Sequence, residues 1–246
     1  MPEKIAFITG GNRGLGFQTA LELKDKAKVV IGVRDASKGE EAVKRLRAAG
    51  ADAAMLQCDT TQPASHQAAY DYFNSRYGRL DILVNNAGIA GGGLPWTGPE
   101  HRAADMPMEV LRKVFDTNFF AHVALTEKLL PLIRKSPAGR IVNLSSILGS
   151  LSLNADPNST YYHAKSFAYD ASKTALNAFT VHLAYDLRDT KIKVNSAHPG
   201  WVKTDMGGPD APMELSEGGK TSAALATLPD DGPTGGFFHM GETLPW

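Results

Sequence analysis

The sequence predicts an α/β fold: a doubly wound parallel sheet with helices on both faces, in a single domain over residues 1–246. Short apolar runs alternate along the chain with longer segments of helical spacing, which is the pattern of βαβ units. Each crossover helix packs on the sheet, so repeated units cover both faces. No linker divides the chain, and its length suits one large α/β domain.

Seven apolar runs are predicted as strands because they are short and bounded by turn residues. The first of them ends at Gly10-Gly11, where a turn follows. In chain order the predicted strands are Lys4–Thr9, Lys28–Val33, Ala53–Cys58, Leu80–Asn85, Gly139–Leu144, Lys191–His198 and Gly235–Met240.

Five segments between these strands are predicted as helices: Leu15–Asp25, Ser37–Ala49, Pro63–Arg76, Pro107–Lys135 and Phe167–Arg188. Ser37 is expected to cap the second helix, and Gly50 is expected to end it. Pro63 suits the first turn of the third helix, whereas Pro131 is expected to end or kink the fourth.

Three further segments are predicted as loops, and each follows the carboxyl end of a strand: Ala90–Asp105, Gly149–Ser166 and Lys203–Gly218. Open parallel sheets bind ligands outside the carboxyl ends of their strands. We therefore expect the three loops to wall one cleft.

The composition excludes several function classes. Lys+Arg and Asp+Glu both number 26, which argues against a nucleic-acid-binding or polybasic membrane-surface protein. Cys58 is the only cysteine, so no internal disulfide forms, and we expect it to be a buried strand residue. No signal-peptide pattern and no long apolar run occurs, so we predict a cytoplasmic protein. No residue cluster has metal-ligand spacing, and no metal is predicted.

A glycine-rich turn joins the first strand to the first helix. Glycines there let the backbone approach a pyrophosphate, and the helix N-terminus offers free N–H groups. The spacing is Gly-x-x-x-Gly-x-Gly, and its position after the first strand favours dinucleotide binding over a purely structural turn. The expected cofactor contacts in this turn are Gly10, Asn12, Arg13, Gly14, Leu15 and Gly16.

The end of the second strand bears on the choice between NAD and NADP. An acidic residue there binds the ribose 2′-OH of NAD, whereas Arg accommodates the 2′-phosphate of NADP. Asp35 keeps NAD open, but Arg34, Lys38 and Arg13 are three cations that suit a phosphate dianion. We favour NADPH/NADP+, with Asp35 capping the next helix or pairing with one of these cations.

Two other strand ends carry candidate cofactor contacts. Asn86, Ala87 and Gly88 close the fourth strand and could pass close under an adenosine, although an ordinary Asn-rich turn is the alternative. Asp59 follows the third strand and could accept a hydrogen bond from an adenine amino group, or cap a turn.

Tyr169 and Lys173 are four residues apart in a predicted helix, so their side chains share one face. The cation beside the phenol is expected to lower the tyrosine pKa toward neutrality, where a general acid works best. Tyr161 and Lys165 form a second pair with the same spacing and are rivals for this role.

The chain resembles the classical short-chain dehydrogenase/reductase family over about residues 4 to 205, in features that follow the family's order: Thr9–Gly16, Asp59, Asn85–Gly88, Asn118, Ser146, Tyr169 with Lys173, and Pro199-Gly200. Three stretches resemble the NADPH-dependent carbonyl reductases more narrowly: Thr117–Phe120, Gly139–Ser146 and Pro199–Met206. The resemblance implies a Rossmann-type fold.

The resemblance also implies roles for individual residues. Tyr169 gives a proton to a carbonyl oxygen as hydride reaches the carbon, and Ser146 hydrogen-bonds the same oxygen. Lys173 holds the nicotinamide ribose and lowers the pKa of Tyr169, while Asn118 holds a water that links Lys173 to solvent. The nicotinamide is held by Pro199, Gly200, Val202 and Thr204.

Two points depend on the family pattern. The pattern places its serine three residues before Gly149, which selects Ser146 over Ser145, and the rival Tyr161/Lys165 pair lacks the family's sequence context. Tyr169 follows Ser146 by 23 positions, more than is usual, and the extra residues fall in Asn154–Phe167. This insertion covers the substrate cleft or alters the subunit interface, so homodimer, homotetramer and monomer all stay open.

We therefore expect an oxidoreductase that transfers hydride from NADPH to a ketone or aldehyde carbonyl, reversible to alcohol oxidation. Its partner is a small-molecule carbonyl substrate, with no nucleic acid and no membrane. The alternatives are an NAD-dependent alcohol or sugar-alcohol dehydrogenase and a non-catalytic NADP-binding regulatory protein.

Overall fold

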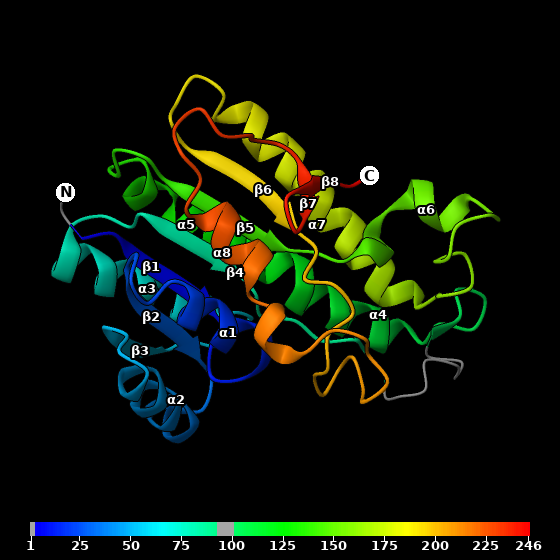
Figure 1. The fold of residues 1–246 in the computed structure, drawn as a ribbon, viewed down its shortest axis with the longest axis horizontal. Coiled ribbons are helices and arrows are strands. Elements are labelled where there is room, and N and C mark those ends of the chain that lie inside the picture. Colours follow the sequence, from blue (N-terminus) through cyan, green and yellow to red (C-terminus); the bar gives the residue numbers. More distant parts are fainter. Residues whose placement is uncertain (1–2, 93–100) are drawn as a thin grey trace.

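The computed structural model describes residues 3–92 and 101–246. These residues form an eight-stranded sheet with the strand order β3-β2-β1-β4-β5-β6-β7-β8, flanked by helices (Figure 1). The strands are β1 (Ile5–Thr9), β2 (Lys28–Val33), β3 (Ala53–Gln57), β4 (Ile82–Asn85), β5 (Arg140–Leu144), β6 (Lys193–Ala197), β7 (Phe237–His239) and β8 (Glu242–Thr243). All pairings are parallel except that of β7 with β8. The predicted fold class is confirmed.

The helices connect these strands in the expected order. They are α1 (Gly14–Glu22), α2 (Ala36–Ala48), α3 (Pro63–Tyr77), α4 (Met108–Phe115), the π-helical turn η2 (Asp116–Phe120), α5 (Ala121–Ile133), α6 (Leu151–Ala155), α7 (Phe167–Asp186) and α8 (Lys220–Ala226), with short 3-10 turns η3 (Ile147–Gly149) and η4 (Leu215–Glu217). That residues 1–246 fold as one domain stays a prediction.

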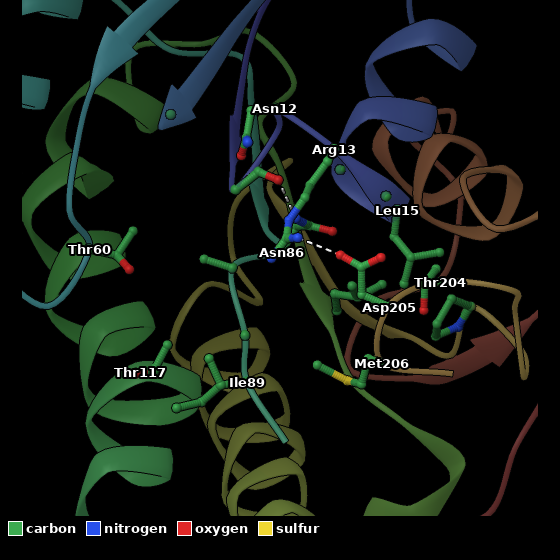
Figure 2. A pocket seen from close by; sticks show the side chains of 18 of the residues that line it. Asn12, Arg13, Leu15, Thr60, Asn86, Ile89, Thr117, Thr204, Asp205 and Met206 are labelled. Carbon is green, nitrogen blue, oxygen red and sulfur yellow. Dashed lines mark hydrogen bonds and ion pairs between the residues drawn. The ribbon is translucent and has the colours of Figure 1, made fainter. Parts of the chain in front are cut away.

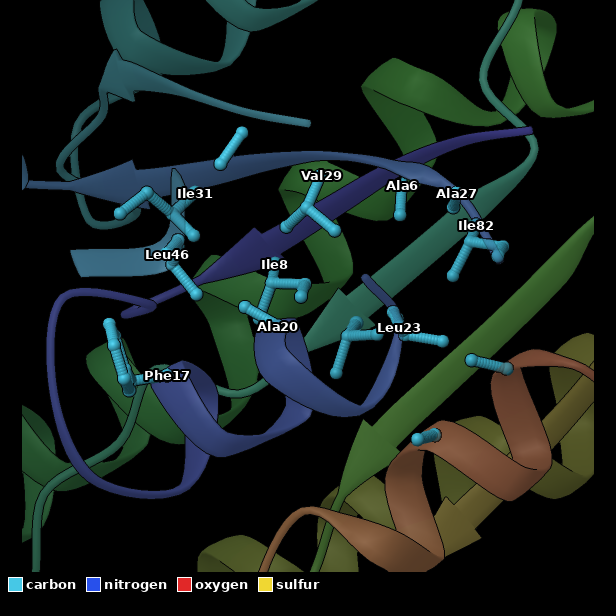
Figure 3. Packing of buried hydrophobic residues seen from close by; sticks show 14 of the residues in the cluster. Ala6, Ile8, Phe17, Ala20, Leu23, Ala27, Val29, Ile31, Leu46 and Ile82 are labelled. Atoms are coloured by element: carbon cyan, nitrogen blue, oxygen red, sulfur yellow. The ribbon is translucent and has the colours of Figure 1, made fainter. Parts of the chain in front are cut away.

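The sheet separates two hydrophobic layers because side chains alternate along each strand. Ala6 and Ile8 of β1 join one cluster with α1, α2 and α8, and Figure 3 shows Ile8 against Ala20 and Leu23. Ile5 and Phe7 point the other way, into a cluster with α3, α5 and α7. Every residue of β1 is buried, as expected of a central parallel strand covered on both faces.

The structure tests two expectations about the ends of helices. Asp35, not Ser37, caps α2: its Oδ1 accepts from the Lys38 backbone N–H at 3.2 Å. The stronger acceptor therefore sits one residue before the helix, while Ser37 lies inside it. Pro131 lies within α5 without ending it, since the helix continues to Ile133.

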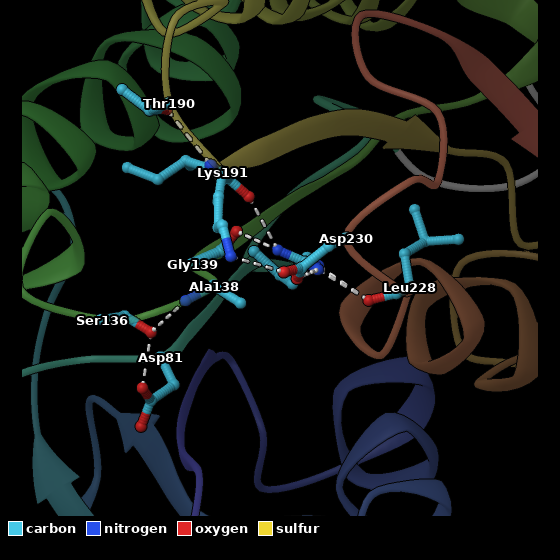
Figure 4. Close-up of polar contacts among 10 residues, drawn as sticks. Asp81, Ser136, Ala138, Gly139, Thr190, Lys191, Leu228 and Asp230 are labelled. Carbon is cyan, nitrogen blue, oxygen red and sulfur yellow. Dashed lines mark hydrogen bonds and ion pairs between the residues drawn. The ribbon is translucent and has the colours of Figure 1, made fainter.

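A buried arginine fixes the C-terminal segment at the edge of the sheet where β5 and β6 begin. The Arg140 guanidinium donates to the carbonyls of Leu228, Gly139 and Lys191 and pairs with Asp230 at 3.2 Å. Figure 4 shows these contacts converging between the two strands. The loops that line the cleft lie at the opposite end of the strands, after their carboxyl ends. Within the described ranges, no helix is both long and apolar enough to cross a lipid bilayer.

Candidate active site

A cleft of about 670 Å³ opens where β1, β2, β4 and β5 end. Figure 2 shows it between the glycine turn, the segment after β4 and the segment around Thr204. Most of the residues predicted from the sequence line it: Gly10, Asn12, Arg13, Gly14, Leu15, Gly16, Arg34, Asp59, Asn86, Ala87, Gly88, Tyr169, Lys173, Pro199 and Thr204. The others lie beside or behind its wall: Lys38, Asn118, Ser146, Gly200 and Val202.

Backbone conformation and close packing both require glycine in the glycine turn. Gly10 and Gly14 have positive φ angles of 66° and 55°, which favour glycine. A Cβ on Gly16 would lie 2.5 Å from the Asn86 amide nitrogen, which itself donates to the Thr9 carbonyl at 2.7 Å. The Asn86 side chain, just after β4, therefore holds the turn in place. The N-terminus of α1 lines the cleft and can bind an anion there.

A second cavity, of about 420 Å³, adjoins the glycine turn. Basic residues outnumber acidic ones by four to two in its lining: Asn12, Arg13, Arg34, Asp35, Lys38, Glu41, Ala42 and Arg45. Asp35 is already engaged, because it caps α2 and its carboxylate lies 3.9 Å from the Lys38 ammonium. Arg34 lines both the cleft and the second cavity. Its guanidinium suits an anion better than a ribose hydroxyl.

An ion pair crosses the mouth of the cleft. Arg13 of the glycine turn pairs with Asp205, and both side chains are exposed. Figure 2 shows the two side chains pointing at one another. The sequence prediction paired Arg13 only with a phosphate and gave no role to Asp205.

Tyr169 and Lys173 lie on α7 and are 8% and 3% exposed. The Lys173 Nζ donates to the Leu144 carbonyl at 2.7 Å and lies 5.6 Å from the centre of the Tyr169 ring. Burial raises the pKa of Tyr169 to about 12, against a lowering effect of its hydrogen bond with Ser146. Burial also lowers the pKa of Lys173 to about 8. The expectation of a tyrosine pKa near neutrality is therefore wrong for the protein alone, because burial disfavours the phenolate.

The two candidate serines occupy different places. Ser146 hydrogen-bonds the Tyr169 side chain, and its Oγ accepts from the Leu148 N–H at 3.2 Å. Ser145 lines the cleft, and its Oγ lies 3.5 Å from the Lys173 carbonyl. Ser146 is thus the serine that contacts the tyrosine hydroxyl.

Asn118 lies in η2 and is fully buried behind the cleft. Its amide nitrogen donates to the Ile89 carbonyl and to Ser172 Oγ, and its oxygen accepts from the Ile89 N–H. The oxygen keeps one lone pair for a further donor. A Cβ on Gly88 would lie 3.3 Å from this oxygen and 3.7 Å from Lys173 Nζ, so Gly88 leaves space between the two.

The rival pair is not arranged for proton transfer. The segment with Tyr161 and Lys165 is not helical, so the four-residue spacing does not place the two side chains on one face. Lys165 Nζ donates to the Asn154 carbonyl at 2.6 Å and lies over the Tyr162 ring. Tyr161 packs against the apolar cluster that contains Tyr169.

The segment after β6 is shaped by close packing. Gly200 has a φ of 92°, and a Cβ there would lie 2.1 Å from the Met213 sulfur. Val202 is buried and pairs with Met213 in an isolated β-bridge. This packing presents Pro199 and Thr204 to the cleft.

Sequence reasoning missed several lining residues: Cys58, Thr60, Thr61, Ile89, Thr117, Leu144, Asp205 and Met206. Cys58, Thr60 and Thr61 come soon after β3 and Ile89 comes soon after β4, and this position after a strand end is the signal that could have found them. Cys58 is buried as predicted, although β3 ends one residue before it, and burial raises the pKa of its thiol to about 11. Among the residues described, no group of three or more His, Cys, Asp or Glu side chains could hold a metal ion.

Comparison with known proteins identifies close relatives. A family profile described as short chain dehydrogenase matches residues 4–215. The chain is 34% identical to carbonyl reductase (NADPH) 1 of Mus musculus, covering 98% of both chains. It is 30% identical to (+)-neomenthol dehydrogenase of Capsicum annuum, covering 97% of this chain and 96% of that one.

Two solved structures are similar to this chain in fold. The NADPH-bound carbonyl reductase from chicken fatty liver has a TM-score of 0.82 at 26% identity, over the full length of both chains. The carbonyl reductase Sniffer of D. melanogaster has a TM-score of 0.84 at 30% identity, covering 99% of each chain.

Proposed function

Because the chain belongs to the short-chain dehydrogenase family, we propose that it is an oxidoreductase that transfers hydride from NADPH to the carbonyl of a ketone or aldehyde, and reversibly oxidises the alcohol. The observation that carries this function is the hydrogen bond between Tyr169 and Ser146, beside Lys173 at the wall of the cleft. A phenol and a hydroxyl that contact each other can bind one carbonyl oxygen together.

NADPH fits the residues that line the cleft. The turn with Gly10, Gly14 and Gly16 admits a pyrophosphate against the N-terminus of α1. The basic cavity beside Arg34 suits the 2′-phosphate, with Arg13 and Lys38 as further donors. When bound, NADPH supplies the hydride.

Other cleft residues place the rest of the cofactor. Asp59 and the backbone around Ala87 line the part of the cleft where they would hold the adenosine. Pro199 and Thr204 would hold the nicotinamide end, with Gly200 and Val202 in the same segment. Asp35 does not compete for a ribose hydroxyl, since it caps α2.

Four side chains have separate roles in the proposed reaction. Tyr169 donates its phenolic proton to the carbonyl oxygen, which holds negative charge as the carbon is reduced. Ser146 donates a hydrogen bond to the same oxygen. Lys173 positions the cofactor ribose, and its positive charge favours loss of the Tyr169 proton. Asn118 holds a water that returns a proton toward Lys173 from solvent.

Activity is expected to fall at alkaline pH because Lys173 loses its charge. Its pKa of about 8 lies below that of Tyr169, about 12, so lysine deprotonation comes first as pH rises. We expect kcat/KM for NADPH to fall above about pH 8, with no fall from Tyr169 until much higher pH. Steady-state rates from pH 6 to 10 at saturating carbonyl test this, because kcat/KM reports the free enzyme. A flat profile to pH 10 would contradict it.

Gly88→Ala is expected to slow turnover by about a hundredfold, the low end of what one proton-transfer group contributes. The added methyl would fill the space between Asn118 Oδ1 and Lys173 Nζ, where we place the relay water. Gly88 does not have a positive φ, so the fold should persist, as thermal melting can verify. An unchanged kcat in a folded variant would exclude a water path at this point.

The function is tested by following reduced nicotinamide absorbance with NADPH and with NADH, each against a panel of ketones, aldehydes and diketones. We expect turnover with NADPH and much slower turnover with NADH. NADPH binding with no turnover of any carbonyl would overturn the enzymatic function, and equal rates would overturn the cofactor assignment. A cytoplasmic location and the oligomeric state stay predictions from the sequence.

A further inference from the structure

A buried polar face runs along the helix behind the cleft. Asn118 of η2 and His122 and Thr126 of α5 follow one another at four-residue intervals, and all three are 0% exposed. Side chains at this spacing share one face of a helix. A fully buried helix face normally carries apolar residues, so three successive polar ones need partners.

Asn118 and Thr126, the outer two residues of this face, have hydrogen-bond partners. Asn118 contacts Ile89 and Ser172. Thr126 Oγ1 accepts from the Asn85 amide at 2.9 Å, and that amide also donates to Asn143. Asn143 in turn donates to Thr180 at 2.8 Å. A hydrogen-bonded polar layer therefore continues beneath the sheet from Thr126.

His122, between them, is only partly satisfied. Among the residues described, none makes a hydrogen bond of normal geometry with either ring nitrogen, although the Ala87 backbone lies close enough to act on the ring. The side-chain oxygen of Asn85 in the same layer is also unpartnered. Leaving a buried polar atom unpaired costs about 1 to 3 kcal/mol, so such atoms usually bind an internal water.

His122 is a neutral imidazole near a cation. Burial, and secondarily the charge of Lys173, lower its pKa to about 3, while the Ala87 backbone acts in the opposite sense. Within the described part of the chain, Lys173 is the only charged group that shifts this pKa. A neutral imidazole has one N–H donor and one acceptor nitrogen. The Ala87 backbone raises the pKa, so its carbonyl faces the ring N–H, and the other nitrogen is an acceptor with no partner among the residues described.

Lys173 has three donors to place. Its ammonium carries three N–H groups, and of the described residues only the Leu144 carbonyl accepts one of them, at 2.7 Å. In the proposed function a second goes to the cofactor ribose, and the third goes to the relay water that Asn118 holds. That water lies in a wall with little access to solvent and needs an acceptor of its own besides Asn118.

We propose that His122 is a positioning residue for Lys173: the internal water that Asn118 holds accepts a hydrogen bond from the Lys173 ammonium and also donates one to the neutral His122 ring. This inference rests on the proposed function. The bridge holds the ammonium in its charged form and fixes its direction, and it joins the reaction centre to the polar layer below the sheet. No proton leaves His122 during the reaction.

The first test compares two substitutions. His122→Leu removes both ring nitrogens at similar volume, and His122→Gln keeps one donor and one acceptor. We expect His122→Leu to move the alkaline limb to lower pH by about one unit, since a lost hydrogen bond to a charged group favours the neutral amine. This shift lowers kcat/KM for NADPH about twofold at pH 7 and about tenfold at pH 9. His122→Gln is expected to stay within about threefold of the unmodified protein at pH 9.

A purely structural histidine would behave differently. His122→Leu would then leave the alkaline limb in place and raise the melting temperature, because an unpaired polar group is removed. That result would overturn the inference. Absence of carbonyl turnover in the unmodified protein would instead overturn the proposed function.

The second test needs no activity and no substitution at position 122. Nitrogen-15 NMR of the histidine rings is recorded from pH 6 to 10 in the unmodified protein and in Lys173→Met. The acceptor nitrogen of His122 is expected to stay unprotonated and to shift with an apparent pKa near that of Lys173, about 8, and this shift should vanish in Lys173→Met. A shift that persists in Lys173→Met, or no shift in the unmodified protein, would overturn the bridge.

Discussion

Tyr169→Phe is expected to lower kcat for carbonyl reduction by about a thousandfold, within the range that one general acid contributes. The phenol is the only group at the wall of the cleft that hydrogen-bonds Ser146 and lies beside Lys173, among the residues described. Phe keeps the ring that packs in the apolar cluster around Ile147. NADPH affinity should therefore stay within a few-fold, and the melting temperature should change little.

Tyr161→Phe is the matched control. It removes the same hydroxyl from a tyrosine that packs near the site, in the segment that supplied the rival pair. Its kcat should stay within about twofold of the unmodified protein. Loss of activity in Tyr161→Phe with activity retained in Tyr169→Phe would reverse the assignment. Rates for both variants should be measured at saturating NADPH, with binding measured separately by fluorescence.

Arg34→Ala is expected to weaken NADPH binding by about ten- to a hundredfold, because a hydrogen bond between a guanidinium and a phosphate contributes about that much to affinity. NADH lacks the 2′-phosphate, so its dissociation constant should change by less than about threefold. Dissociation constants for both cofactors, measured by calorimetry at one fixed salt concentration, test this difference.

Arg188→Ala is the control for a general loss of positive charge. Arg188 is exposed at the end of α7, where its guanidinium lies over Tyr185, and it does not line the cleft. Its removal should leave both affinities unchanged. Equal losses for NADPH and NADH in Arg34→Ala would contradict the phosphate assignment.

The sequence predicted the fold and most of the cleft because those features depend on local rules. Apolar periodicity placed β1 through β7, and glycine spacing placed the turn before α1. The capping of α2 by Asp35 was one of two alternatives raised for that residue, and the structure supports it. The two-residue strand β8 carries too little pattern to be found.

Features that depend on tertiary contacts were not predictable. The pKa of Tyr169 is set by burial, which no four-residue spacing reveals. The Arg13–Asp205 pair joins residues 192 positions apart. The polar spacing of Asn118, His122 and Thr126 is visible in the sequence, but only the burial of all three makes it informative.

The most direct test of the proposed chemistry follows the hydride itself. The protein is incubated with NADPH deuterated at the transferable position of the nicotinamide and with the best carbonyl substrate of the panel, and the product is analysed by mass spectrometry and NMR. We predict one deuterium on the former carbonyl carbon and one alcohol formed for each NADPH consumed. An alcohol without deuterium from either face of the labelled cofactor, or NADPH loss without alcohol, would contradict hydride transfer by this protein.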